Sequence, residues 1–258
     1  MTAAYRIGAV VGWHARAYRR MWFGTMTVSF LNPIFFLLAM GVLLGALVDR
    51  SDPDLGGLSY LEFVAPALLA ATAMQTAASV TTFPVRAGLK WWKTYHAVVA
   101  TPVTVRELVA GVIAWAGVRV ALSVAAFALV AAVAGAFGSA LAVLTPLAAL
   151  LCGLAFSALI AAMSATIPSD QYLAALYRFG LVPLFLFSGT FFPISQLPGW
   201  LEPVAWATPL WHGVELCRDL AGGDVELQPT LLHVGYLVVL TAAGIAIAVR
   251  GCARKLEL

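Results

Sequence analysis

The segment that most constrains the fold is a strongly apolar stretch between Phe185 and Leu220 that prolines interrupt repeatedly. The prolines in question are Pro193, Pro198, Pro203 and Pro209. A stretch this apolar does not suit a loop in water, and the prolines prevent one continuous spanning helix because each removes a backbone donor. We therefore expect a helix that ends near Pro193, followed by short broken helices that enter part of a bilayer. Irregular backbone is tolerated there only where protein or a water-filled cavity covers it.

The composition is that of a membrane protein. Of the 258 residues, 62% are hydrophobic and only 10% are charged, which is too little charge to cover the surface of a soluble domain. A helix needs about 20 apolar residues to span a bilayer. Six windows meet this need, at residues 23–48, 61–83, 108–134, 146–166, 177–193 and 229–249. The sequence thus predicts one all-α integral membrane domain over residues 1–258, with six transmembrane helices.

The basic residues fall mainly on one side of these windows. Twelve of the 15 lie in the N-terminal segment, between spans two and three, at the start of span five or at the C-terminus. The opposite loops contain only Arg50 and Arg218, together with acidic residues: Asp49, Asp52, Asp54, Glu202, Glu215, Asp219, Asp224 and Glu226. Because Lys and Arg accumulate in cytoplasmic loops, we expect both termini on the cytoplasmic side.

Two segments on the predicted cytoplasmic side combine basic and aromatic residues. Residues 1–22 suit either a helix in the plane of the membrane interface or an ordinary aromatic and arginine anchor of the first span. The loop 83–109 favours a short helix that ends at Thr101 and Pro102. On one face of that helix we expect Leu89, Trp92, Tyr95, His96 and Val99. Exposed aromatics beside lysines suit docking of another protein or contact with lipid headgroups.

Three stretches resemble one known family. They are YLEFVAPALLA at 60–70, TYHAVVATP at 94–102, and FLFSGTFFPISQLPGW followed by PLWHGVELCRDL within 185–220. With the six spans and cytoplasmic termini, they look like the membrane subunit of a type-2 ABC exporter. The resemblance is strongest to the subgroup of nodulation lipo-oligosaccharide exporters and actinobacterial drug-export permeases. This family commonly has an acidic residue where this chain has His96, so a salt bridge to the ATPase is not carried over there.

The resemblance implies a fold and a set of partners. Residues 1–22 would form an interfacial helix, residues 86–101 a coupling helix seated on an ATPase, and residues 194–226 two short re-entrant helices on the outer side. The chain would lie in a bacterial cell membrane, in contact with lipid, and join separate nucleotide-binding subunits and a second copy of itself or a sister permease. Those subunits would bind ATP and Mg²⁺, and this chain would hold no cofactor.

The predicted site residues form three groups. The coupling residues would be Lys90, Trp91, Trp92, Lys93, Tyr95, His96, Thr101 and Pro102. The re-entrant segment would present Pro193, Pro198, Trp200, Pro203, Trp206, Pro209, His212, Glu215 and Arg218. A substrate path would use Arg119, Tyr172, Tyr177 and Arg178, and structural anchoring or packing of these four is the alternative. Arg119 stands out because a charge within a span usually faces a cavity or a partner.

Several chemistries have no motif in this chain. There is no G-x-x-x-x-G-K-[ST] loop for binding ATP phosphates, and neither HExxH nor G-x-S-x-G occurs. His212 and Glu215 are three residues apart, but two ligands do not make a metal site. The 3 cysteines lack metal-ligand spacing. We therefore expect no catalytic residue, no metal site and no nucleic-acid partner.

These observations favour the permease of an ATP-driven exporter, which is not itself an enzyme. It would move an amphipathic or lipid-linked substrate outward from the cytoplasmic side, and a glycolipid, a lipo-oligosaccharide, a drug and a peptide are all compatible. The alternatives are a membrane-embedded enzyme, a channel that does not use ATP, and a regulatory membrane subunit. Polar clusters inside the spans would favour the first two, and only Arg119 is found there.

Overall fold

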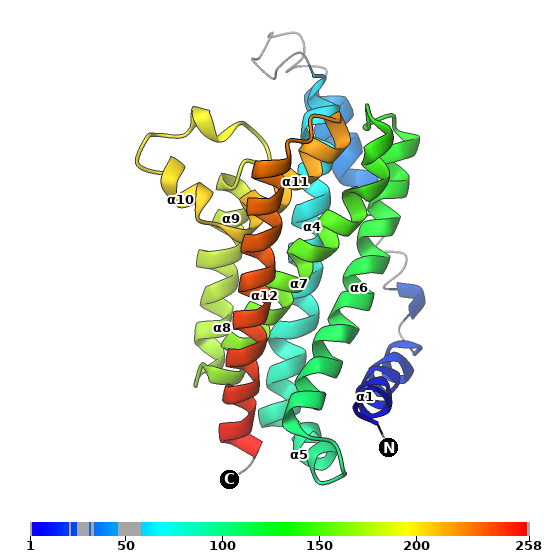
Figure 1. Cartoon of the computed structure of the whole chain (residues 1–258), viewed down its shortest axis with the longest axis vertical. Helices are drawn as coiled ribbons and strands as arrows, with labels where there is room; N and C mark the ends of the chain where they lie inside the picture. The colour runs from blue at the N-terminus through cyan, green and yellow to red at the C-terminus, as the bar shows by residue number, and fades with distance from the viewer. Residues whose placement is uncertain (1, 21, 25–30, 32–33, 46–57, 257–258) are drawn as a thin grey trace.

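The computed structural model describes residues 2–20, 22–24, 31, 34–45 and 58–256. Within these residues the regular structure is helical and contains no strand. The long helices run side by side along the long axis of the molecule (Figure 1). In this part of the chain, 4 helical runs are long and apolar enough to cross a membrane: Tyr60–Trp91, Val105–Val133, Ala140–Thr166 and Leu227–Leu256. The protein is therefore built as an all-α, multi-pass bundle.

Four of the predicted spans correspond to these runs. The helices are α4 (Tyr60–Arg86) with the π-helix η3 (Ala87–Trp91), α6 (Val105–Val133), the 3-10 helix η4 (Ala140–Leu144) with α7 (Thr145–Thr166), and α12 (Leu227–Leu256). The predicted first span, 23–48, lies partly outside the described residues. Its longest described piece is the π-helix η1 (Leu37–Leu44).

The predicted fifth span corresponds to a shorter helical run. The helices α8 (Asp170–Leu176), η5 (Tyr177–Leu181) and α9 (Val182–Phe187) follow one another without a break, but they are not among the four apolar runs. The expected helix end near Pro193 is wrong, because α9 already ends at Phe187. The chain turns at Gly189, whose φ of 77° is a left-handed conformation that glycine adopts without steric cost.

Two of the long helices begin with the same local signal. Ser59 and Thr104 each accept a hydrogen bond from the backbone of the glutamate three residues later, Glu62 or Glu107. The glutamate carboxylate accepts in return from the backbone of the capping residue. This capping box satisfies donors that the first turn of a helix leaves unpaired. The starts of α4 and α6 are therefore set by residues close together in sequence.

The helix α7 lies at the centre of the bundle, packed against α4, α6, α12 and α11 (Pro209–Gly222). Many of its buried residues are alanines, which lets neighbouring helices approach closely. A Cβ added to Gly244 of α12 would lie 2.7 Å from the backbone carbon of Ala158. A Cβ added to Gly213 of α11 would lie 2.5 Å from Sγ of Cys152. Small residues at these crossings therefore bring α11 and α12 against α7.

The two ends of the bundle carry different short elements. At one end, the α5 end, lie α5 (Thr94–Val99), α1 (Ala3–Tyr18) and the last turns of α12 (Figure 1). At the other, the α10 end, lie α10 (Glu202–Trp206) and α11, preceded by the 3-10 helix η6 (Ile194–Gln196). The helix α1 packs against α6, while α8 lies on the other side of the bundle (Figure 1).

Candidate functional site

The chain between α4 and α6 forms an exposed tip at the α5 end, and we call residues 90–101 the tip. Trp91 and Trp92 are 46% and 74% exposed, and Lys90 and Lys93 are exposed beside them. The prediction of a single helix over residues 86–101 is wrong, because Lys93 has a left-handed backbone with φ of 51° that separates η3 from α5. Four predicted coupling residues thus lie together on an exposed turn.

Tyr95 supports α5 from beneath. Tyr95 is only 2% exposed. Its ring lies so close to Gly88 that a Cβ added to Gly88 would be 2.6 Å from Cε1 of the ring. The ring also meets Trp13 of α1 edge-on, with 6.4 Å between centroids. The expected shared face of Trp92 and Tyr95 is therefore wrong, since one side chain is exposed and the other is buried. His96 is half-buried.

An apolar groove separates α1 from the tip. Its cavity of about 350 Å³ is lined by Ala9, Val10, Trp13, Thr94, Ala97, Val98, Thr101 and Val103. Beside it, Arg6 ties α1 to α6, with Nη2 2.8 Å from the carboxylate of Glu107. The same guanidinium donates to the carbonyl of Pro102 at 3.1 Å. The predicted coupling residues Thr101 and Pro102 thus lie where α1 meets the tip.

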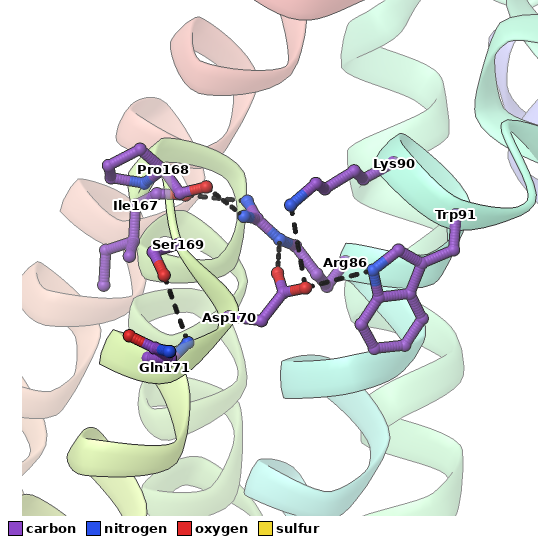
Figure 2. A network of polar contacts seen from close by, with 8 residues as sticks. All are labelled: Arg86, Lys90, Trp91, Ile167, Pro168, Ser169, Asp170 and Gln171. Atoms are coloured by element: carbon purple, nitrogen blue, oxygen red, sulfur yellow. Dashed lines mark hydrogen bonds and ion pairs between the residues drawn. The ribbon is translucent and has the colours of Figure 1, made fainter.

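A buried arginine joins α4 to the connection between α7 and α8 (Figure 2). The side chain of Arg86 is 2% exposed, and its Nε lies 2.7 Å from Oδ1 of Asp170. Its two Nη atoms donate to backbone carbonyls, Nη1 to Ile167 at 2.7 Å and Nη2 to Pro168. A charge is tolerated in such a site only when it is paired and hydrogen-bonded. Arg86 is therefore a fixed joint between two parts of the chain far apart in sequence.

The second carboxylate oxygen of Asp170 holds the tip (Figure 2). Oδ2 lies 3.6 Å from Nζ of Lys90 and accepts a hydrogen bond from Nε1 of Trp91 at 3.2 Å. The hydrogen bond from Arg86, helped by Trp91 and the two nearby cations, holds the pKa of Asp170 below its ordinary value. The ring of Trp91 also stacks on Phe83 of α4, with 6.2 Å between centroids. Asp170 therefore links the tip directly to the start of α8.

The residues predicted to form a substrate path do not come together. Arg119 lies against α1, with its guanidinium carbon 3.9 Å from the centre of the Tyr18 ring. Tyr177 begins η5, directly after α8, and its ring stacks on a phenylalanine of α4 with 6.4 Å between centroids. Tyr172 of α8 and Arg178 of η5 are exposed. The four residues therefore do not form one site, because Arg119 lies against α1 and the other three belong to α8 and η5.

Two short helices occupy the segment predicted as re-entrant. Pro203 and Pro209 lie in the first turns of α10 and α11, where a missing backbone donor is tolerated. The helix α10 is short and mostly exposed, whereas α11 packs among α4, α7 and α12. The other prolines and the tryptophans of this segment are half-buried or exposed: Pro193, Pro198, Trp200 and Trp206.

Arg218 fastens α11 to two other segments. Its Nη1 lies 3.2 Å from the carboxylate of Glu215, one turn earlier. Its Nε donates to the carbonyl of Phe63 in α4 at 3.3 Å, and its Nη2 donates to the carbonyl of Gly189. The guanidinium carbon also lies 3.8 Å from the centre of the Phe63 ring. Arg218 thus holds the turn after α9 and the start of α4 against α11.

His212 is paired with a histidine that sequence reasoning did not single out. Its Nδ1 lies 2.7 Å from Nδ1 of His233 in α12, and both residues are buried. One ring donates and the other accepts, because a neutral imidazole has one donor and one acceptor. The ring of His212 also stacks on Tyr236, with 3.9 Å between centroids. This pair joins α11 to α12.

One contact that the sequence analysis did not predict, that of Asp170, could have been anticipated from the sequence. Asp170 is the only acidic residue between the fourth and fifth predicted spans, on the side that carries the excess of basic residues. An isolated acid of this kind is a reasonable candidate for an ion pair. Arg86 and His233 carry no comparable signal, because Arg86 is one of several basic residues between the second and third predicted spans and His233 is a single neutral side chain in the last span.

Comparisons with known proteins agree with one another. A family model described as ABC-2 type transporter matches residues 5–220. Nodulation protein J of Rhizobium meliloti is 30% identical over 223 residues, which cover 86% of this chain and 82% of that protein. The protein of the same name from Sinorhizobium fredii is 31% identical over 84% of this chain and 83% of its own length. The one from Bradyrhizobium diazoefficiens is 30% identical over 92% and 88%. The aligned family region includes the tip and nearly all of α11.

Proposed function

Because the chain belongs to the ABC-2 type transporter family, we propose that it is the membrane subunit through which an ATP-driven exporter passes its substrate. The family makes it a multi-pass transport subunit that is not itself catalytic, and implies association with an ABC ATPase subunit. The exposed tip is the observation that carries the rest of the proposal. It supplies a docking surface at one end of the bundle.

In this proposal the ATPase subunit docks on the tip. Trp91 and Trp92 are large aromatic side chains, half to three-quarters exposed, that stand beside Lys90 and Lys93. Aromatic residues at the centre of an interface carry much of its binding energy. The apolar groove between α1 and the tip extends this surface. The ATPase supplies the bound ATP and Mg²⁺, and this chain supplies the contact.

In this proposal, movement of the docked ATPase subunit is transmitted to the membrane helices through the contacts between Arg86 and Asp170. Asp170 contacts Lys90 and Trp91 with one oxygen and Arg86 with the other. Since Asp170 is also the first residue of α8, a displacement of the tip pulls on the run from α8 to α9. That run would be the fifth of six spans, and residues 23–48 would supply the first.

Orientation in the membrane follows from charge. The α5 end would face the cytoplasm, because most basic residues flank it and cytoplasmic loops are rich in Lys and Arg. The helix α1, the tip and the last turns of α12 lie at this end, as the proposal requires (Figure 1). Residues 194–226, with α10 and α11, would then form the re-entrant segment of the outer leaflet.

The substrate would be amphipathic or lipid-linked, and would move from the cytoplasmic side outward. This class rests on the resemblance to exporters of lipo-oligosaccharides and drugs, and the similarity to nodulation proteins supports it. A glycolipid, a lipo-oligosaccharide and a drug are the leading candidates. The functional unit would contain two membrane subunits, either two copies of this chain or one copy and a sister permease.

Co-purification with a candidate ABC ATPase tests the docking surface. Trp92→Ala should weaken binding of the ATPase about tenfold or more, the effect expected for an aromatic residue at an interface centre. Trp200→Ala is a matched control, since both tryptophans are 74% exposed but lie at opposite ends of the bundle. The control should bind as the unchanged chain does. Equal binding by both variants would contradict docking at the tip.

A further inference from the structure

Arg119 is a charged residue with few partners among the residues that the structure describes. It lies near the middle of α6, and its guanidinium rests on the Tyr18 ring at 3.9 Å. Across the described residues it has no hydrogen bond and no ion pair, so the cation–π contact with this ring is its one electrostatic interaction there. A guanidinium has five N–H donors. A cation in contact with an apolar span usually has a further partner.

Two further polar groups of α1 lie against the same helix as Arg119, one on Tyr18 and one on His14. The hydroxyl of Tyr18 and Nε2 of His14 are buried and have no hydrogen-bond partner in the described part of the chain. Both rings pack on Trp115 of α6, at 5.7 Å for Tyr18 and 6.2 Å for His14. Burial lowers the pKa of His14 to about 4, so its ring is neutral at pH 7 and offers one N–H. These groups lie one turn apart on α1, on the side that faces α6.

The side chains of this cluster lie within reach of a membrane interface. The helix α1 follows α6, with Arg6 at Glu107 near its start and Tyr18 at Arg119 near its end. Above Arg119, α6 continues to Val133, a rise of about 21 Å. The hydrocarbon core of a bilayer is about 30 Å thick. Arg119 therefore lies within side-chain reach of the headgroups at the α5 end.

The neighbouring sequence also suits that level. Arg19 and Arg20 follow Tyr18 directly and are exposed. Trp22, two residues after Arg20, is 54% exposed. Arginine together with tryptophan and tyrosine is the usual composition at the boundary between hydrocarbon and headgroups. Three arginines thus gather around the end of α1.

We propose that Arg119, Tyr18 and His14, flanked by Arg19 and Arg20, bind the phosphate of an anionic phospholipid at the junction of α1 and α6. The guanidinium fork matches two phosphate oxygens, and the hydroxyl and imidazole supply further donors. The acyl chains extend along the exposed apolar side chains of α6, which include Val118 and Leu122. The lipid holds α1 against α6, next to the tip. This inference rests on the proposed function in one respect only, the assignment of the lipid to the cytoplasmic leaflet.

Native mass spectrometry of the purified full chain can measure this binding. Phosphatidylglycerol and phosphatidylcholine are titrated separately, and the bound lipid is counted. The unchanged chain should bind one phosphatidylglycerol about tenfold more tightly than phosphatidylcholine, and Arg119→Gln should remove that preference. Tyr18→Phe should reduce it about threefold, the loss of one hydrogen bond. Arg250→Gln is the control, because it removes an exposed arginine of α12 near the same end. The control should keep the preference.

Three outcomes would overturn the proposal. They are an unchanged preference in folded Arg119→Gln, an equal loss in Arg250→Gln, and displacement of the lipid by millimolar inorganic phosphate, which would identify a soluble anion as the ligand. Circular dichroism and size-exclusion chromatography establish folding, and Tyr18→Phe decides the matter if Arg119→Gln does not fold. No ATPase is present in this experiment. A failure here leaves the co-purification result intact, and a failed co-purification leaves this result intact.

Discussion

At the scale of single residues, Asp170 is the contact on which the coupling argument depends. Its carboxylate contacts both the buried Arg86 and the exposed pair Lys90 and Trp91. Loss of its carboxylate leaves the buried guanidinium of Arg86 with backbone carbonyls alone. An unpaired buried charge is strongly destabilising. The role of Asp170 is therefore both to stabilise Arg86 and to position the tip.

We predict a graded loss of stability when Asp170 is replaced. Asp170→Ala should lower the Tm of the purified chain more than Asp170→Asn, because the amide oxygen can still accept a hydrogen bond. Since the pKa of Asp170 lies below its ordinary 3.8, its stabilising effect is present above that pH and is lost as the pH falls through the folded-state pKa. The difference in Tm between the unchanged chain and Asp170→Asn should thus shrink in acid.

Asp224→Ala is the control for this series, since it removes an exposed carboxylate at the other end of the bundle. Its Tm at pH 7 should not fall as that of Asp170→Ala does. Equal Tm values for Asp170→Ala and the unchanged chain at pH 7 would show that the Arg86 joint does not depend on its carboxylate.

At the scale of helices, the local sequence explains where elements begin better than how they face one another. Helix starts depend on nearby residues. Ser59 and Thr104 each cap a helix together with the glutamate three positions later, and Pro203 and Pro209 lie in the first turns of their own helices. The break at Lys93 has no such local signal, because a lysine with positive φ is uncommon. It is held by the packing around it, which only the folded chain reveals.

The same limit explains the misplaced tyrosine of the predicted coupling helix. A helical repeat puts Tyr95 and Trp92 on one face, so the sequence predicts that both contact a partner. The break turns α5 so that Tyr95 packs on Gly88 and Trp13. The exposure of the tryptophans and lysines could be predicted from the sequence. The direction of each side chain depends on tertiary packing and could not.

We predict that Gly88→Ala will disturb the tip without removing any of its exposed side chains. The new Cβ would lie 2.6 to 2.8 Å from three atoms of the buried Tyr95 ring, so the ring and α5 must move. Overpacking of this kind costs about 1–3 kcal/mol. Thermal unfolding should show this loss. In Gly235→Ala, where nothing lies within 4 Å of the added Cβ, the stability should stay the same or rise. Matching Tm values for the two variants would contradict the packing role of Tyr95.

At the scale of the whole molecule, the bundle carries different short elements at its two ends. The tip, α1 and the Arg86 joint lie at the α5 end, and α10 and α11 lie at the other (Figure 1). Composition and apolar windows were enough to predict an all-α membrane protein with four of the apolar runs that the structure contains. Contacts such as Arg218 with Gly189, or His212 with His233, join segments far apart in sequence and needed the fold.

Site-directed photo-crosslinking in intact cells tests the central claim most directly, because it reports docking and orientation together. A photo-reactive amino acid replaces either Trp92 in the tip or Trp200 near α10, in cells that also produce the ATPase subunit. The account predicts a covalent product with the ATPase from position 92 and none from position 200. A product from position 200 alone would place the ATPase at the opposite end of the bundle and contradict the account.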